Sequence, residues 1–209
     1  MSTIDKLSCS LGRRDEIPNQ ELARALVEAN DTAGVREIAA NLWNKDSAIP
    51  ADCIKVLYEI GYRKPDLVAA YAGDFLKLLK SRNNRLVWGG MIALSTVGAL
   101  AADELYPHAA EIQEAMDGGS VITRDAGVLA LAGIASTNNE HCIAIFPYLL
   151  EHLRTCRPKD VPQHSEKIIG AVSAANKAEF IAVLEKRMED LQGSQVTRLK
   201  KVIKQAQSR

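Results

Sequence analysis

Apolar residues recur along this chain with the spacing of α-helical faces, and no segment shows the sustained alternation of apolar and polar residues typical of strands. The two clearest segments are 85–102, RLVWGGMIALSTVGALAA, and 122–136, ITRDAGVLALAGIAS. The pattern, with Asp31 as an N-cap and Pro18 and Pro50 near helix starts, predicts helices throughout. The eleven predicted helices cover residues 19–29, 31–43, 50–61, 66–80, 84–100, 103–116, 121–135, 139–156, 162–174, 177–191 and 194–207.

The second of these segments repeats the first at an offset of 37 residues, which places Ala93 on Ala130. An apolar pair three residues apart then recurs five times along the chain, as Leu57 with Ile60, Leu94 with Val97, Leu131 with Ile134, Ile169 with Val172, and Leu199 with Val202. Repeats of roughly 30 to 40 residues are typical of solenoids, in which each helical unit buries its apolar face against the next unit.

Small residues recur on the same helix faces as the apolar pairs. They stand four positions before the first member of a pair, at Cys53, Gly90, Gly127 and Ser165, and four positions after it, at Gly61, Gly98, Ala135 and Ser173. Residues at i and i+4 share a helix face, and a glycine inside a helix costs roughly 1 kcal/mol relative to alanine. Their recurrence therefore predicts close helix packing, with coincidence as the alternative.

The alternation of helices over 31–207 resembles HEAT-like repeats. Segment 122–136 is closest to the usual second helix of such a repeat, and LYPHAAEI and IFPYLLEHL resemble the first. The resemblance implies that Pro107 and Pro147 bend first helices, and that Arg124 contacts an aspartate ladder. Val87 and Pro162 stand where flanking repeats would carry that arginine, so the ladder is incomplete. The fold implied is an all-α, right-handed superhelix of about five HEAT-like hairpins.

The repeat pattern does not extend to the N-terminal segment. Residues 1–16 are polar, and we expect them to be flexible and poorly ordered. The predicted organisation is therefore a flexible segment, 1–16, followed by one HEAT-like repeat domain, 17–209.

Composition indicates an ordinary globular protein without a strong overall field. There are 26 lysines and arginines and 26 aspartates and glutamates, so the formal net charge is zero, which gives no global attraction to nucleic acid or membrane. The longest apolar run, 91–102, is too short for a membrane span, which needs about 20 residues. Four cysteines without paired spacing and an N-terminus without an apolar core favour a cytoplasmic location.

The resemblance places the second helices on the concave face of the solenoid. Two rows of residues would line that face: Lys55, Ile92, Leu129 and Lys167, and beside them Glu59, Thr96, Gly133 and Ala171. The two central helices are apolar nearly all round, which predicts burial on both sides. We expect neighbouring helices of the same chain to cover this apolar face. The alternatives are a second copy of the chain and an apolar helix of a partner.

Trp88 and Asp125 occupy equivalent repeat positions, and an arginine lies close to each in the sequence, Arg85 and Arg124. With Lys55 and Lys167 these residues are the candidate partner-binding site, because an aromatic ring beside guanidinium groups can hold a peptide, an anion or a flipped base. The alternative is a packed tryptophan with solvated or capping arginines.

A scaffold or adaptor that binds a protein or peptide partner without catalysis is the favoured function. The alternative is a nucleic-acid-binding protein or enzyme, because alkylpurine DNA glycosylases are also built from HEAT-like repeats and Trp88 and Asp125 are similar to their cleft residues. The zero net charge and the lack of a second cleft tryptophan depart from that family. A homo-oligomer is also possible. The basic C-terminal residues from Arg198 to Arg209 form either a cap of the solenoid or a contact surface.

Metal ligands and catalytic groups are sparse. His152 and Cys156 lie at i and i+4 on the helix that also carries His141 and Cys142, and His164 is the only nearby candidate for a third ligand. Zinc needs three or four ligands in tetrahedral geometry, and we expect no metal site. The sequence contains no GxGxxG, P-loop or HExxH pattern, so no cofactor and no catalytic residue are predicted.

Overall fold

The computed structural model describes residues 2–209, and their regular secondary structure is entirely helical. This confirms the predicted all-α class. Side chains cap several helices as the sequence suggests, and Asp31 accepts a hydrogen bond of 2.8 Å from the Gly34 N–H. The α-helical segments are α1 (Ile17–Glu28), α2 (Thr32–Ala40), α3 (Ala48–Arg63), α4 (Ala72–Leu78), α5 (Asn84–Val97), α6 (Ala102–Leu105), α7 (Ala109–Asp117), α8 (Val121–Ala135), α9 (Asn139–Thr155), α10 (Val161–Ile168), α11 (Lys177–Met188) and α12 (Ser194–Gln207).

Two predicted helices are interrupted. In place of the predicted helix 66–80, 3₁₀ turns at Pro65–Leu67 and Ala69–Tyr71 precede α4. The predicted helix 103–116 is divided in two. Residues 103–116 form α6, a 3₁₀ turn at Tyr106–His108 that contains Pro107, and α7. Proline has no N–H to donate and its ring clashes with the preceding turn, which explains the interruption. Pro147, in contrast, lies inside the continuous helix α9.

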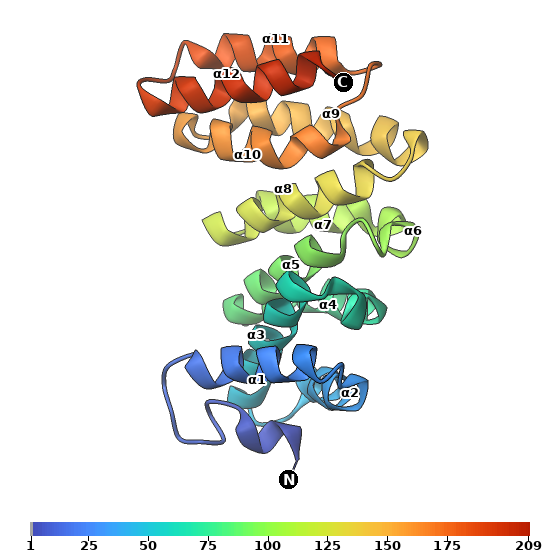
Figure 1. The fold of residues 1–209 in the computed structure, drawn as a ribbon, viewed down its shortest axis with the longest axis vertical. Helices are drawn as coiled ribbons and strands as arrows, with labels where there is room; N and C mark the ends of the chain where they lie inside the picture. The colour runs from blue at the N-terminus through green and yellow to red at the C-terminus, as the bar shows by residue number, and fades with distance from the viewer. Residues whose placement is uncertain (1) are drawn as a thin grey trace.

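The helices form two rows along the long axis of the molecule. We call α1, α3, α5, α8, α10 and α12 the second-helix row, because each member contacts the next. The first-helix row comprises α2, α4, α7, α9 and α11. Figure 1 shows the layers stacked from the N-terminus at the bottom to the C-terminus at the top. Five hairpins of one first and one second helix follow one another, as expected for a solenoid.

The recurring small residues lie where helices approach closely. A Cβ atom on Gly98 would stand 2.7 Å from the Ala130 carbonyl oxygen, and one on Gly90 would stand 3.0 Å from that of Phe75. A Cβ on Gly127 would collide with the Met116 side chain. The packing explanation of the glycine pattern is therefore correct at these positions.

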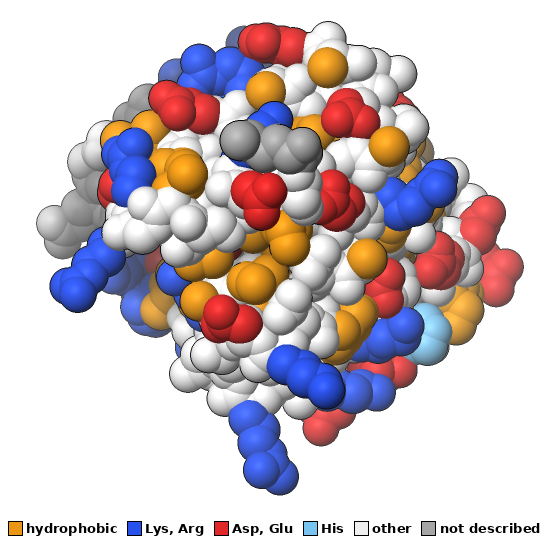
Figure 2. Space-filling view, turned by 90° about the horizontal axis from the view of Figure 1, so that it is seen from below, with side chains coloured by type: hydrophobic (Ala, Val, Ile, Leu, Met, Phe, Trp, Pro, Cys, Tyr) orange, Lys and Arg blue, Asp and Glu red, His pale blue; other side chains and the backbone are white. Residues whose placement is uncertain are grey.

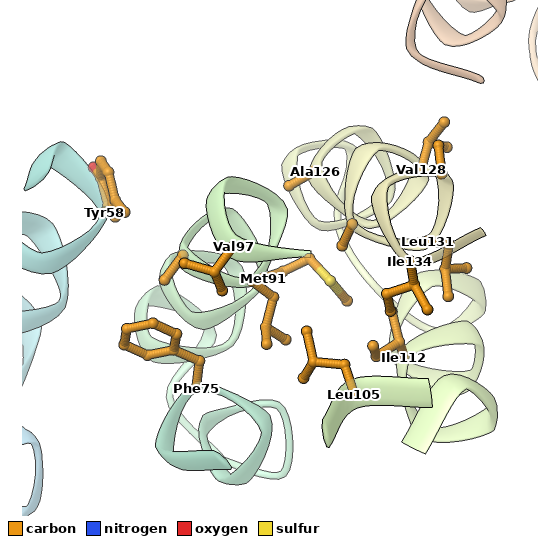
Figure 3. Packing of buried hydrophobic residues seen from close by; sticks show 14 of the residues in the cluster. Tyr58, Phe75, Met91, Val97, Leu105, Ile112, Ala126, Val128, Leu131 and Ile134 are labelled. Carbon is orange, nitrogen blue, oxygen red and sulfur yellow. The ribbon is translucent and has the colours of Figure 1, made fainter. Parts of the chain in front are cut away.

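The repeated apolar pairs form the core. Leu94, Val97, Leu131 and Ile134 are fully buried, and Figure 3 shows Leu131 and Ile134 converging with Leu105 and Ile112 from the first-helix side. Helix α5 contacts α3, α4 and α8. Neighbouring helices of the same chain thus provide most of the cover that the apolar central helices require.

The N-terminal segment differs from the prediction of poor order. Residues Thr3–Lys6 form a 3₁₀ turn, and Leu7 is fully buried. The Ser8 N–H donates to Asn19 Oδ1 at 2.9 Å, and the Cys9 N–H donates to Asp52 Oδ2 at 2.8 Å. The segment therefore packs onto the first layer, because its few apolar side chains find a buried site there.

Within residues 2–209, no helix is both long enough and apolar enough to cross a bilayer.

Candidate functional site

The six predicted site residues fall into two groups on the second-helix row. Lys55, Arg85 and Trp88 gather around α3 and α5 together with Tyr58 and Glu16, whereas Arg124, Asp125 and Lys167 lie at α8 and α10.

In the first group, Lys55 is a buried ion-pair centre. Its Nζ lies 2.9 Å from Glu16 Oε2, 3.0 Å from Glu59 Oε1 and 4.8 Å from the centre of the Tyr58 ring. Burial lowers the pKa of this ammonium group, but its contacts with Tyr58, Glu16 and Glu59 outweigh burial and raise the pKa above its ordinary value. Lys55 is therefore a permanent cation that holds α3 against the segment preceding α1.

Trp88 belongs to an aromatic group that the sequence did not reveal. Its ring lies 6.4 Å from that of Tyr58, and the Tyr58 ring lies 5.9 Å from that of Tyr62 in an edge-to-face arrangement. We call Tyr58, Tyr62 and Trp88 the aromatic ledge. Tyr62 is 59% exposed, whereas Tyr58 is buried and Trp88 is half-buried. The i, i+4 spacing of Tyr58 and Tyr62 was the available signal.

Arg85 lies beside the aromatic ledge and is partly engaged. One guanidinium nitrogen is 3.4 Å from Glu16 Oε1 and 3.6 Å from Asp52 Oδ1, and 41% of the side chain is exposed. This geometry leaves guanidinium surface for a further partner. It also places a charge of each sign, Arg85 and Glu16, within reach of a ligand on the ledge.

In the second group, Arg124 serves as a helix cap. Its Nε donates to the Met116 carbonyl at 3.2 Å and its Nη2 donates to the Asp117 carbonyl at 3.5 Å, at the C-terminal end of α7. A cation at this end of a helix is favourable because the last carbonyls lack helical partners. These contacts match the alternative prediction that Arg124 caps a helix. They are made to backbone carbonyls, whereas the resemblance implied contacts with a ladder of aspartates.

Asp125 joins α8 to α10. Its Oδ1 lies 2.6 Å from Lys167 Nζ and accepts a hydrogen bond of 2.8 Å from Gln163 Nε2. Lys167 Nζ also donates to the Asp125 carbonyl at 2.7 Å. The same carboxylate oxygen lies 3.3 Å from His164 Nε2.

Beside Asp125 lies a pocket of about 410 Å³ between α7, α8, α9 and α10. Its walls bring together three possible metal ligands, His152, Cys156 and His164, whose ligand atoms lie within 4.8 Å of one another. His141 lies elsewhere, stacked on Tyr106 with ring centres 4.1 Å apart. The i, i+4 spacing places His152 and Cys156 on one face of a helix. His164 comes close to them because residues 157–160 turn the chain back against α9.

Burial sets the protonation of this cluster. It lowers the pKa of His152 to about 4, with a smaller contribution from His164, and it lowers the pKa of His164 although the Asp125 carboxylate opposes the shift. Burial also raises the pKa of the Cys156 thiol. At neutral pH the pocket therefore holds two neutral imidazoles and a thiol.

Charge on the N-terminal face of the molecule is mixed. Figure 2, which views the molecule from its N-terminal end, shows basic and acidic side chains interspersed with small apolar areas. This mixture agrees with the zero net charge.

No protein-family model and no curated protein matches this chain. Solved structures with the same architecture do match. A crystal structure of an engineered protein aligns with a TM-score of 0.68 and 19% identity, over 100% of this chain and 98% of the other. A designed armadillo repeat protein in complex with the peptide (KR)4 aligns with a TM-score of 0.67 and 16% identity, over 90% and 85% of the two chains.

A computationally designed armadillo repeat protein for modular peptide recognition gives a TM-score of 0.67 and 14% identity, over 97% of this chain and 98% of the other. At such low identity these matches show the fold, a helical repeat solenoid, and nothing about activity.

Proposed function

We propose that this protein is a non-enzymatic adaptor that binds an extended peptide segment of a partner protein along the second-helix row. The observation that carries the proposal is the aromatic ledge, in which Tyr62 is exposed and Trp88 is half-buried, beside partly exposed charges.

Tyrosine and tryptophan are suited to this task because each offers a large rigid apolar surface with a polar tip. Such residues dominate the binding energy of many interfaces, and they lose little conformational entropy on binding. Burial, the Glu59 carboxylate and, more weakly, Asp125 raise the pKa of Tyr62. Its hydroxyl therefore stays protonated at neutral pH and can donate to a peptide carbonyl.

Two similar solved proteins support a peptide as the partner class. One is a designed armadillo protein described in complex with the peptide (KR)4, and another was designed for modular peptide recognition. The shared solenoid gives this chain the same kind of continuous helical surface. HEAT-like repeats stay our prediction for its finer class, since the similar structures are of armadillo type.

The aromatic ledge and Arg85 supply the contact surface in this proposal, and the other predicted residues act mainly through structure. Lys55 and Arg124 have their polar groups engaged within the fold, and Asp125 and Lys167 hold each other. The nucleic-acid alternative requires Asp125 to be available, whereas Lys167 and Gln163 both contact its Oδ1.

The proposal is tested with a displayed library of random linear peptides. We expect enrichment of related sequences and micromolar binding of a synthetic representative in fluorescence anisotropy. Tyr62→Ala and Trp88→Ala should each weaken that binding at least about tenfold, because truncating an aromatic anchor typically costs 2 kcal/mol or more.

Ile143→Ala is the matched control, since Ile143 is 68% exposed on α9 in the first-helix row. It should leave peptide binding unchanged. Failure to enrich any peptide, or equal binding by the ledge variants and the parent, would contradict the proposal. Binding of duplex or single-stranded DNA that falls steeply with salt would instead favour the nucleic-acid alternative.

A further inference from the structure

The pocket between α7, α8, α9 and α10 contains a group of side chains that peptide binding does not use. His152 and Cys156 come from the last turn and C-cap of α9, and His164 comes from α10. The residue His164 is only 4% exposed, and His152 and Cys156 are half-buried against the pocket. We propose that His152, Cys156 and His164 bind a zinc ion, with a fourth coordination position open to the pocket.

The distances fit this geometry. His152 Nε2 and His164 Nδ1 lie 2.9 Å apart, and the Cys156 sulfur is within 4.8 Å of the ligand atoms of both histidines. In a tetrahedral zinc site with bonds of about 2.0 to 2.3 Å, neighbouring ligand atoms are about 3.3 to 3.6 Å apart. Small side-chain rotations therefore convert this cluster into a three-ligand site without a change of fold.

The second nitrogen of His164 strengthens the assignment. Its Nε2 faces Asp125 Oδ1 at 3.3 Å while its Nδ1 faces His152. A carboxylate that accepts from the far nitrogen of a histidine is the usual support of metal-binding imidazoles, because it fixes the ring and the tautomer. Asp125 is in turn held by Lys167 and Gln163.

The end of α9 that carries Cys156 is also fixed. The buried Arg187 guanidinium donates to the carbonyls of Leu153 and Arg154 at 2.6 Å and of Cys156 at 2.9 Å. The thiol position is thus set by contacts that do not depend on a metal.

The donor set selects the class of ion. Two imidazole nitrogens and one thiolate suit zinc, whereas magnesium and calcium require oxygen ligands. The carboxylate of Asp160, which lines the same pocket, is held by Arg157 Nε at 2.7 Å. Because all three ligand residues line the pocket, the fourth position faces it, and water or a donor atom of a small ligand completes the coordination there.

Binding requires one change of protonation. Zinc binds histidine as the neutral imidazole and cysteine as the thiolate, so the Cys156 thiol must lose its proton. The ion takes the place of that proton, which leaves to solvent. One proton is therefore released for each ion bound.

The test uses the full chain without a histidine tag, stripped of metal with a chelator and titrated with Co²⁺ and then Zn²⁺. Co²⁺ should bind one to one, with a thiolate charge-transfer band in the near ultraviolet and intense tetrahedral bands in the visible. Zn²⁺ should remove both sets of bands. Absence of stoichiometric binding, or octahedral Co²⁺ spectra without the thiolate band, would overturn the proposal.

Variants locate the site. His152→Ala, His164→Ala and Cys156→Ser should each weaken Zn²⁺ binding by at least tenfold, and Asp125→Asn should weaken it about tenfold or more, as loss of supporting contacts typically does. Cys142→Ser and His108→Ala are matched controls outside the cluster and should bind like the parent. Unchanged affinity in the three ligand variants would refute the assignment.

If circular dichroism shows that a ligand variant does not fold, the site is located by a measurement on the parent protein. Zinc-edge anomalous scattering from crystals of the unaltered chain should then place the ion between α9 and α10. An ion at any other position would be evidence against the site. The outcome is independent of peptide binding, because none of these measurements contains a peptide.

Discussion

Single polar side chains fix the parts of this fold that the repeat pattern leaves undefined. Arg187 is the clearest case, because its position on an amphipathic helix suggests a solvated cation, whereas it is 8% exposed and donates to three carbonyls at the end of α9. Glu37 acts in the same way at the other end of the molecule, where it accepts from the Thr3 N–H and from the Ser2 hydroxyl.

The Glu37 contacts predict an acid-dependent loss of stability. The hydrogen bonds from Ser2 and Thr3 lower the pKa of Glu37 to about 2 from an ordinary value of 4.5. A lowered carboxyl pKa contributes stability fully above about pH 4.5, and this contribution disappears as the pH falls toward 2. Because the carboxylate is half-exposed, we expect Glu37→Gln to lower the free energy of unfolding by only about 1 kcal/mol at pH 6.

Urea unfolding of the parent and Glu37→Gln at several pH values measures this effect, and the difference between them should shrink as the pH approaches 2. Glu21→Gln, a change of an exposed carboxylate on α1, provides the control and should alter stability little at any pH. A Glu37→Gln deficit that is constant with pH would show that the lowered pKa is not its cause.

At the scale of the helices, the spacing between neighbours is set by residues that lack side chains. Gly127 on α8 faces the Met116 side chain of α7, and Gly98 faces the Ala130 backbone of α8. These contacts could be anticipated because the glycines recur at matched repeat positions. The break at Pro107 was anticipated only in part, since the resemblance implied a bend and the helix is interrupted by a 3₁₀ turn.

Gly127→Ala should therefore destabilise the protein by about 1 to 3 kcal/mol, the usual cost of adding a methyl group to a well-packed core. Gly170→Ala is a suitable comparison, because its added Cβ would meet no atom within 4 Å. That change should be neutral or stabilising by up to about 1 kcal/mol, since alanine restricts the unfolded chain. Thermal or chemical unfolding of both variants measures the contrast, and equal effects would contradict the packing argument.

For the whole molecule, the sequence was sufficient to predict the solenoid, its hairpins and most helix positions, because these follow from periodic apolar residues that end up fully buried, such as Leu57 and Leu131. It did not predict the grouping of Tyr62 with Trp88. It offered His164 as the nearby candidate for a third ligand beside His152 and Cys156, but it did not show that the three side chains meet, and no metal site was predicted. Those groupings depend on how successive layers are rotated and on the path of short loops, neither of which leaves a periodic signal.

Layered packing also predicts uneven resistance to local opening. Helices α5 and α8 lie between other layers, whereas α1 and α12 end the second-helix row. Amide hydrogen exchange should be slowest in α5 and α8 and faster by about tenfold or more in the terminal helices, because local opening is easiest where fewest apolar contacts are lost. Uniform exchange across all layers would indicate that the chain opens only as a single unit.

The row arrangement of α3, α5 and α8 gives the proposed binding surface a fixed step. Packed helices lie about 8 to 10 Å apart, and an extended peptide advances about 3.3 Å per residue. Each layer therefore corresponds to about three residues of a bound peptide. Tyr62 on α3 and Trp88 on α5 come from successive layers. The side chains of a partner segment that contact successive layers would therefore lie three residues apart, and its recognition motif would have a period of three residues.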